Sequence, residues 1–423
     1  MNLIKSVFSA AATLYFAAAL IGCTQPVDCN QEATAPCFLL RAEQSLQQID
    51  DAASFVSAAY EYAEALLAAQ RTGEAMQVLG AAKETAARIE NPLVRANSYV
   101  EIAKGYKALK AQDENAATAR LAMQTLEAVE DVTKRNDAIG KIAVLLAAAG
   151  ALEDANDIAG AMPETAADLA SLKARTLQGI AVTLAENSDF AGAQAVLPEI
   201  KMGLVYYQAK ARSDIAKLAV EANKTNMADR LLREAEEIAN TQDDGYFIAG
   251  ALRNTATVYA RNNNQAEAKR LYALARDAAL QLSVPQRKAR TLSRIATALA
   301  DDGTYAAARA IFPQAVAIAQ TEPSAVMRRY SLYEIAGSAA FAGEWETAYG
   351  LLEDIPAQPF GSAASLKAAT QRDIAWGLLR HGKSSEATAL ASAIASPRER
   401  VQAFSRMARL MIGHTTQAYP RYL

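Results

Sequence analysis

Cysteine and histidine are scarce in this chain of 423 residues, and each shortage excludes a class of site. The three cysteines all precede residue 38, so the rest of the chain holds neither a zinc ribbon nor a thioredoxin-like motif. The only histidines, His381 and His414, lie far apart in the sequence and far from any cysteine. No H-E-x-x-H or G-x-S-x-G pattern occurs. We therefore expect no metal, no cofactor and no enzymatic activity.

An excess of positive charge is also lacking. The 43 lysines and arginines stand against 46 acidic residues, which leaves a net charge of −3 and a pI near 5.7. Nucleic-acid binding needs a basic surface that draws in phosphates, and no such excess is present. We expect no nucleic-acid partner.

One nucleotide-binding pattern is formally present. Gly377 to Ser384 matches G-x-x-x-x-G-K-[ST], a loop that binds phosphate when a strand precedes it and a helix follows. The preceding residues, Gln371 to Trp376, have helical spacing, and Gly382 falls in a turn that every repeat described below possesses. We expect no nucleotide partner.

The N-terminus predicts where the chain resides. Lys5 precedes an apolar run from Val7 to Ile21, which has the length of a signal-peptide core and is short for a bilayer span. The run ends in Leu-Ile-Gly-Cys at Cys23, which resembles the lipobox of bacterial lipoproteins. The resemblance implies that residues 1–22 are a signal peptide and that Cys23 is lipidated. Cleavage after Ala19, which would release a free periplasmic protein, and a retained membrane anchor are the alternatives.

The residue after the predicted lipidation site is Thr24 rather than aspartate. In such lipoproteins an aspartate there favours retention in the inner membrane, so the resemblance implies the periplasmic face of the outer membrane. Cys29 and Cys37 remain in an exported, oxidising environment, where a pair so close in sequence can form a disulfide. Free thiols are the alternative. We expect residues 23–45 to be a linker that carries this pair.

A repeat of about 39 residues organises the rest of the chain. Each copy has an apolar residue followed by alanine, a turn residue seven positions later and a small residue five positions after that, as in Ile295-Ala296, Gly303 and Ala308. The copy at Ala103 fits with a one-residue slip near Ala111. The alanines of the nine copies are Ala63, Ala103, Ala143, Ala181, Ala216, Ala256, Ala296, Ala336 and Ala375.

Each copy predicts two helices. Apolar residues recur at helical spacing on both sides of the turn, and Pro92, Pro285, Pro323 and Pro397 lie between copies, where a helix must break. Met407-Ala408 begins an incomplete tenth copy. A single helix pair cannot bury its apolar face, so neighbouring pairs must stack and share a core. We expect an open, uniform array.

This pattern resembles the tetratricopeptide repeat. The copies share with that family an apolar-small step, a large apolar residue three positions later, and then glycine and alanine. They depart from it in being longer than its usual repeat and in mostly lacking its first-helix aromatic. The resemblance implies an all-α, right-handed α-solenoid of about nine helix-turn-helix (TPR-like) repeats over residues 46–423. In this family the first helices line a binding groove.

We predict a partner-binding groove from residues on the exposed side of the first helices. Basic side chains recur there from Arg175 onward, and aromatic ones join them in the last two complete copies, which suits a partner with carboxylates and apolar or sugar faces. An ordinary solvated surface, with the aromatics in the core, is the alternative. The predicted groove residues are Arg175, Lys210, Arg253, Arg290, Tyr330, Tyr333, Arg372 and Trp376.

These features together predict a lipid-anchored, non-enzymatic scaffold that binds a protein partner in the periplasm of a bacterial cell envelope. A protein that binds or acts on peptidoglycan or another glycan through the C-terminal aromatic and basic residues is the alternative.

Overall fold

The chain is an all-α repeat protein in the computed structural model, which describes residues 29, 33–201, 204–241, 245–353 and 366–413. Over these residues it forms twenty α-helices and one 3-10 helix, with no strand. The predicted all-α solenoid is confirmed. The predicted signal peptide 1–22 and the predicted lipidation site Cys23 lie outside the described residues. No helix among those described is both long and apolar enough to cross a bilayer.

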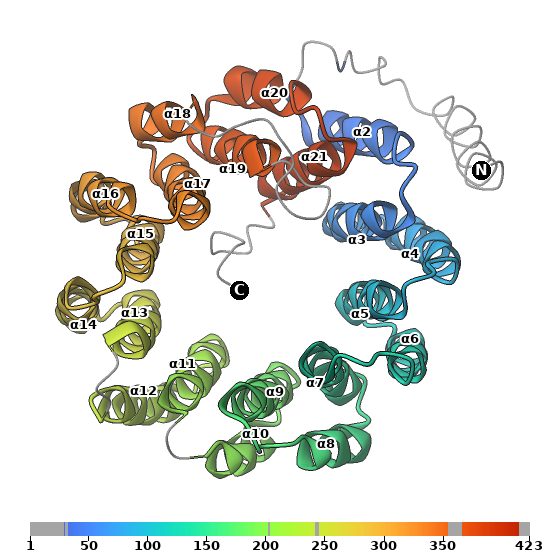
Figure 1. Cartoon of the computed structure of the whole chain (residues 1–423), viewed down its shortest axis with the longest axis horizontal. Coiled ribbons are helices and arrows are strands. Elements are labelled where there is room, and N and C mark those ends of the chain that lie inside the picture. The colour runs from blue at the N-terminus through green and yellow to red at the C-terminus, as the bar shows by residue number, and fades with distance from the viewer. Residues whose placement is uncertain (1–28, 30–32, 202–203, 242–244, 354–365, 414–423) are drawn as a thin grey trace. The chain divides into compact units, whose positions relative to one another are not determined.

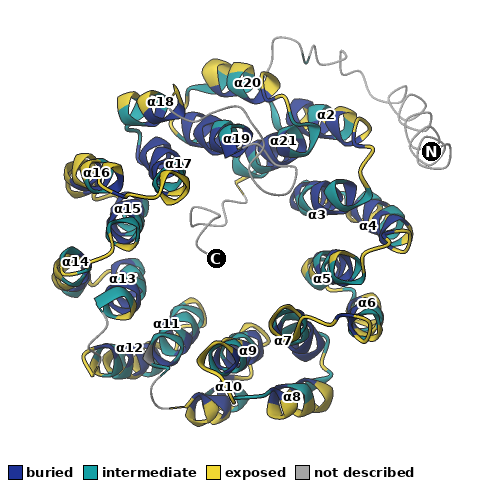
Figure 2. Cartoon of the chain, in the orientation of Figure 1, coloured by how far each residue is buried: buried dark blue, intermediate teal, exposed yellow. Residues whose placement is uncertain are grey.

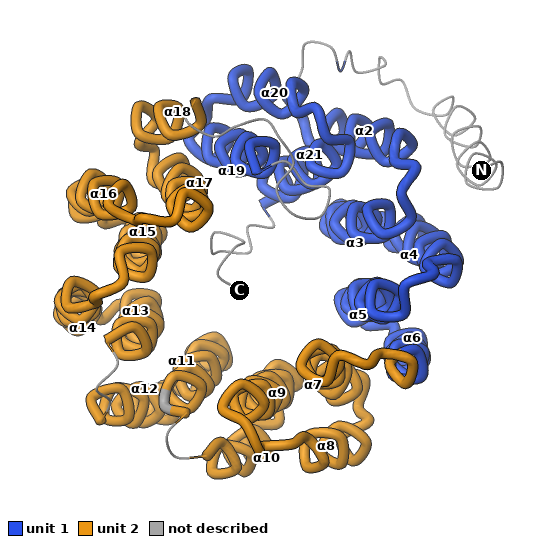
Figure 3. Tube along the Cα trace, viewed as in Figure 1, with its two compact units in different colours: residues 1–125, 359–416 blue, residues 126–358, 417–423 orange. Residues whose placement is uncertain are grey.

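The helices belong to two compact units (Figures 1 and 3). Unit 1 contains both ends of the helical array: α2 (Ala35–Leu46), α3 (Ala52–Ala68), α4 (Thr72–Ala86), α5 (Pro92–Ala108), α6 (Gln112–Leu126, whose last residue begins unit 2), α19 (Leu366–Arg380), α20 (Ser384–Ser392) and α21 (Pro397–Met411).

Unit 2 contains the middle of the chain. Its helices are α7 (Val132–Ala148), α8 (Leu152–Ala161), α9 (Ala167–Glu186), α10 (Phe190–Val196), the 3-10 helix η2 (Leu197–Glu199), α11 (Val205–Glu221), α12 (Thr225–Ala239), α13 (Gly245–Arg261), α14 (Gln265–Leu280), α15 (Pro285–Asp301), α16 (Tyr305–Gln320), α17 (Ala325–Phe341) and α18 (Trp345–Glu353).

The predicted repeat alanines mark the first helix of each pair. All nine fall in odd-numbered helices from α3 to α19, and each is at most 2% exposed. Small side chains at these positions let neighbouring helices approach closely, which explains why alanine dominates a core of this kind. Figure 2 shows the buried faces of the helices turned toward one another within each pair.

The turn inside each pair follows the predicted frame closely. The residue seven positions after each alanine has a positive φ angle. The first of these residues is Gln70 (φ 61°) and the last is Gly382 (φ 77°). This left-handed conformation costs a residue with a Cβ about 1 kcal/mol, so glycine is favoured and asparagine is tolerated. The slip predicted near Ala111 is wrong: Lys110 takes the left-handed turn in register, and Asn115 occupies the small position and is buried.

The starts of the first helices are set by caps and prolines. Asp51, Asn91 and Ser324 each accept a hydrogen bond from the backbone N–H three residues later, at 2.7, 3.1 and 3.3 Å. Pro92 and Pro285 occupy first helical positions, where no intrahelical donor is needed. These local signals separate one repeat from the next without long loops.

Two predictions fail in unit 1. Residues 35–45 of the predicted 23–45 linker belong to helix α2, because Phe38, Leu39 and Ala42 bury their side chains there. The open array is also wrong within this unit, since the last helix, α21, packs on both α2 and α3. Phe38 stacks on Phe404 with ring centroids 6.2 Å apart. The apolar surfaces that two free solenoid ends would expose cover each other instead.

Unit 2 has two layers of helices. The first helices α7, α9, α11, α13, α15 and α17 pack on one another in chain order, and each second helix packs on its own partner (Figure 3). The first helices line the concave side of this unit. Equivalent positions on the concave face of this layer therefore recur from one helix pair to the next.

Candidate functional site

The predicted groove residues of unit 2 lie on its layer of first helices. Arg175 is on α9, Lys210 on α11, Arg253 on α13, Arg290 on α15, and Tyr330 and Tyr333 on α17. Tyr330 is exposed and Tyr333 is half-buried. The structure thus places all six on consecutive first helices, as the spacing predicts.

The cations of this set are engaged by neighbouring side chains. Arg175 on α9 pairs with Asp137 on α7, and Arg290 on α15 makes two hydrogen bonds of 2.6 Å to Glu334 on α17. Lys210 lies 2.7 Å from Asp214. Burial would lower the pKa of Lys210, but the adjacent Asp214 carboxylate outweighs it and the pKa lies above its ordinary value. We call these ion pairs, which join neighbouring first helices or adjacent turns of one first helix, the rungs of unit 2.

Arg372 and Trp376 do not line an exposed groove. Arg372 is only 7% exposed and Trp376 only 6%, and both belong to α19 in unit 1. Helical spacing assigned them to the free face of a first helix. The helix α21 packs against α19, and its Glu399 and Gln402 contact Arg372, so the part of that face at Arg372 is covered. The predicted groove is therefore corrected to exclude these two residues.

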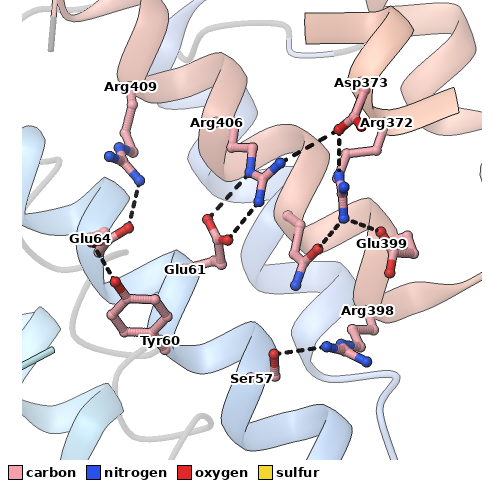
Figure 4. Close-up of polar contacts among 11 residues, drawn as sticks. Ser57, Tyr60, Glu61, Glu64, Arg372, Asp373, Arg398, Glu399, Arg406 and Arg409 are labelled. Carbon is pink, nitrogen blue, oxygen red and sulfur yellow. Dashed lines mark hydrogen bonds and ion pairs between the residues drawn. The ribbon is translucent and has the colours of Figure 1, made fainter. Parts of the chain in front are cut away.

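Arg372 instead belongs to a cluster of charged residues where the two ends of the helical array meet (Figure 4). We call this cluster the charged junction. Its members come from α3, α19 and α21: Ser57, Tyr60, Glu61, Glu64, Arg372, Asp373, Arg398, Glu399, Gln402, Arg406 and Arg409.

Two ion pairs connect α3 to α21. Arg406 donates to Glu61 at 2.9 Å, and Arg409 donates to Glu64 at 2.6 Å. A hydrogen bond of 3.0 Å from Arg398 to the Ser57 hydroxyl lies closer to the start of each helix. The donors on α21 thus meet a matching series of acceptors along α3.

A second set of contacts connects α19 to α21. The Arg372 guanidinium donates to Glu399 and Gln402, both at 2.6 Å, and to Asp373 at 2.9 Å. Arg406 lies 3.5 Å from Asp373 and so joins the two sets. Each of these arginines has oxygen partners, which offsets the desolvation cost of burying its charge.

The carboxyl groups of the junction differ in their titration. Burial opposes ionisation of Glu61, but the Arg406 guanidinium outweighs it and holds the pKa of Glu61 below its ordinary value. For Glu64 burial prevails over Arg409, and the pKa is raised. Burial together with the charges of Glu64 and Glu61 raises the pKa of Tyr60 well above its usual range. Tyr60 therefore stays protonated and donates to Glu64 at 2.8 Å.

The helix α5 contributes one more acid beside the junction. Glu101 has a raised pKa, because its burial outweighs the attraction of Arg398 and Lys104. A raised pKa in the folded state means that this group favours folding at low pH and loses that contribution as the pH rises through its folded-state pKa. The opposite holds for Glu61. The arrangement can thus hold the ends of the array together and make that contact sensitive to ionisation.

A smaller, partly buried cluster links three successive helices of unit 2. Tyr272 on α14 hydrogen-bonds to Asp302 at the end of α15, and its hydroxyl lies 2.9 Å from that of Thr257 on α13. Burial, with a smaller effect from Asp301, raises the pKa of Asp302 to about 6. This cluster ties one repeat to the next.

One small cleft lies between α9 and the segment that leads into α11. Its walls include Lys173 and Lys201, which both pair with Glu164. Its free volume of about 10 Å³ is room for about one water molecule. No group of metal-ligating side chains occurs within the part of the chain that the structure describes.

The remaining sequence features also have definite places. Cys29 and Cys37 form a disulfide, with Cα atoms 5.1 Å apart, that ties residue 29 to α2. The phosphate-loop pattern begins inside α19, and Gly382 takes the left-handed turn before α20. A helix therefore occupies the place where a phosphate-binding loop needs a strand.

The repeat pattern of the sequence does not predict the charged junction. A signal for it exists: Glu61 and Glu64 are three residues apart on α3, and Arg406 and Arg409 have the same spacing on α21. The equal spacing of the two acids and the two arginines becomes informative only once α21 is known to pack against α3. The sequence alone does not show that contact.

Comparisons with known proteins do not assign a family. No family model matches the chain, and no curated protein matches its sequence. Among solved structures, the protein Ton1535 from Thermococcus onnurineus NA1 is similar at 14% identity and a TM-score of 0.33, over 88% of this chain and 99% of that one. A circular tandem repeat protein with a novel repeat topology is similar at 12% identity and a TM-score of 0.23, over 92% and 97%. Scores this low support no further argument.

Proposed function

We propose that this chain is a lipid-anchored, non-enzymatic scaffold of a bacterial cell envelope that binds another protein through the first-helix layer of unit 2. The observation that supports this is the layer itself: six consecutive first helices present recurring side chains on a concave side. Helical repeat proteins use such extended surfaces for binding. The pairs are TPR-like in the positions of their buried alanines and turns, although their period is longer.

In this proposal the partner contacts unit 2 around α17. Tyr330 is 36% exposed, and Tyr333 follows it by three residues on the same helix. Aromatic side chains of this kind often dominate binding energy, because they bury a large area at low entropic cost. Arg175 and Arg290 pair with acids on neighbouring first helices, and Lys210 pairs with Asp214 on its own helix. Arg253 lies on α13, between α11 and α15.

In-cell crosslinking tests the partner surface. A photo-crosslinking amino acid replaces Tyr330 or Tyr333, and a matched control replaces Leu274, which is exposed on the second helix α14 of the same unit. We expect one protein to be captured from the two α17 positions and not from Leu274. Equal and diffuse capture from all three positions would contradict the proposal.

The lipid anchor rests on the sequence of residues 1–24. We expect palmitate labelling of the wild-type chain, which fractionates with the outer membrane and faces the periplasm. Cys23→Ser removes the thiol that carries the lipid, so labelling should disappear. An unlabelled wild type would favour cleavage after Ala19 and a free periplasmic protein. Labelling that persists in the variant would show that the assigned residue is wrong.

The glycan alternative depends on four residues acting together. Burial of Arg372 and Trp376 leaves only Tyr330 and Tyr333 of that set at the surface, so the protein-binding proposal has the better support. Saturable binding of peptidoglycan fragments by the purified chain, or their cleavage, would reverse this choice.

A further inference from the structure

Exposed apolar side chains gather at one edge of unit 2. Among the described residues, eleven large apolar side chains are exposed, and four of them lie directly before or within the first three residues of α13, α15 and α17. Such a concentration is unlike the scattered single residues that most protein surfaces show. The four are Phe247 (36% exposed), Val284 (43%), Val326 (39%) and Met327 (39%).

The helix order places these side chains along a common edge. The helices α13, α15 and α17 pack side by side in chain order, and each is the first helix of its pair. First helices of successive repeats run in the same direction, so their N-terminal ends lie at the same edge of the layer. The apolar residues project there at helix ends. We call this surface the rim patch.

Basic residues accompany the apolar ones. Arg287 and Lys288 follow Val284 on α15, and Arg328 and Arg329 follow Met327 on α17. The first turns of both helices contain no acidic residue. Four cations thus lie next to exposed apolar side chains on two neighbouring helices.

An acidic residue in the connection before α17 is already engaged by other partners. Glu322, in the connection before α17, is buried and accepts hydrogen bonds from the backbone N–H groups of Gln286 and Ser324, each at 3.2 Å. Its backbone carbonyl accepts from Arg328 at 2.9 Å. Asp243 and Asp244 precede α13 in the sequence and lie outside the described residues. The basic part of the rim patch is therefore its α15 and α17 portion.

We propose that the rim patch docks on an anionic phospholipid surface. This deepens the lipid-anchored scaffold proposed above and rests on it for the membrane's presence, but the docking itself needs no acyl chain. Apolar side chains enter the interfacial region while lysine and arginine contact lipid phosphates, a combination that interfacial proteins use. Residues at the ends of adjacent helices can all reach a flat surface, whereas an extended peptide is usually held in a groove between elements.

Vesicle sedimentation tests the docking. The chain from Thr24 onward retains every described residue and lacks both the apolar N-terminal run and Cys23, so neither can cause binding. It is mixed with vesicles of phosphatidylcholine alone or with added phosphatidylglycerol. We expect binding to the anionic vesicles only, weakened by added salt. R287Q/R329Q should weaken it by about tenfold or more, from roughly 1 kcal/mol per surface cation. V326S/M327S should also weaken it.

A matched control comes from the same unit. L274S/R276Q removes one exposed apolar side chain and one exposed cation from α14, away from the rim patch, and should leave vesicle binding unchanged. Circular dichroism checks that all variants fold. Absence of binding to the anionic vesicles, or equal losses in rim and control variants, would overturn the proposal. So would rim variants that keep vesicle binding but lose a crosslinked protein partner, which would make the patch a protein-binding surface. Because the assay uses no acyl chain, its result is independent of whether Cys23 is lipidated.

Discussion

Both units contain arginine–carboxylate ion pairs between first helices, but these pairs differ in their exposure to solvent. In unit 1, Arg406 and Glu61 join α21 to α3, and each side chain is 14% exposed. In unit 2, Arg175 and Asp137 join α9 to α7, with exposures of 45% and 31%. Water and salt screen an exposed pair, while a buried pair leaves an uncompensated charge if one member is lost. The comparison teaches that burial, rather than the pairing itself, sets what each tie contributes.

Unit 1 also concentrates its ties, whereas unit 2 spreads them. The charged junction joins three helices through shared partners such as Asp373, which contacts both Arg372 and Arg406. The rungs of unit 2 mostly connect one helix to the next. We therefore expect losses in the junction to be large and coupled, and losses in the rungs to be small and additive.

The largest effect should follow from breaking the junction. Arg406→Ala leaves Glu61 buried without its main partner, so the free energy of unfolding of the local structure should fall by about 3–5 kcal/mol. Faster hydrogen exchange in α21 and α3 would report it. Replacing both partners, as in R406M/E61L, should recover much of the loss because no charge stays buried alone. If the double variant is as unstable as R406A, the electrostatic account is wrong.

Reduction of the disulfide should have the next largest effect. The Cys29–Cys37 bond closes a short loop at the start of α2, which packs on α21. Reduction should destabilise this part of unit 1 by about 2 kcal/mol. Hydrogen exchange measured with and without a phosphine reductant should show the change in α2. A change of equal size in α13 to α17 would contradict a local role.

The half-buried Asp302 in unit 2 tests whether burial, rather than membership of a unit, sets the contribution of a charged group to stability. The pKa of Asp302 is raised from 3.8 to about 6, so its contribution to stability is complete below its ordinary pKa and is lost as the pH rises through about 6. Asp302→Asn removes this loss and should stabilise the protein by about 1 kcal/mol at neutral pH, after allowance for solvent screening. Thermal melts at pH values near 4 and 7 check this. An equal effect at both values would refute it.

The smallest effect should come from an exposed rung. Arg175→Gln leaves Asp137 with its neighbour Lys141 at 2.7 Å, so the stability of unit 2 should change by about 0.5 kcal/mol or less. Urea denaturation at low and high salt measures it, and the small difference should vanish at high salt. A loss as large as that of Arg406→Ala would remove the contrast between the two units.

Most of the helical architecture could be predicted from the sequence. The spacing of alanine and turn residues is local information, because each helix pair repeats the same requirements for close approach and a left-handed turn. Even the irregular copy at Ala103 keeps the frame, with Lys110 in the left-handed conformation. The candidate site could be predicted only in part. Side chains in the middle of the array, such as Arg175 and Arg290, lie on the layer of first helices that their spacing indicates.

The residues at the ends of the array could not be placed in this way. Arg372 and Trp376 have the helical positions of surface residues, yet both are buried, and Arg372 hydrogen-bonds to Glu399 and Gln402 on α21. Glu61 and Arg406 are separated by more than three hundred residues in the sequence and are hydrogen-bonded in the structure. Their pairing depends on which helix covers the free end of the first pair, and no local pattern encodes that.

The sequence by itself determined the helix pairs, their turns and their buried alanines, because these follow from backbone conformation and side-chain size over distances of a few residues. Only the tertiary structure decided that the last helix covers the first two, which arginines are buried and paired, and where exposed apolar side chains collect. Those outcomes depend on desolvation and on contacts between distant segments, and both exist only once the helices are packed.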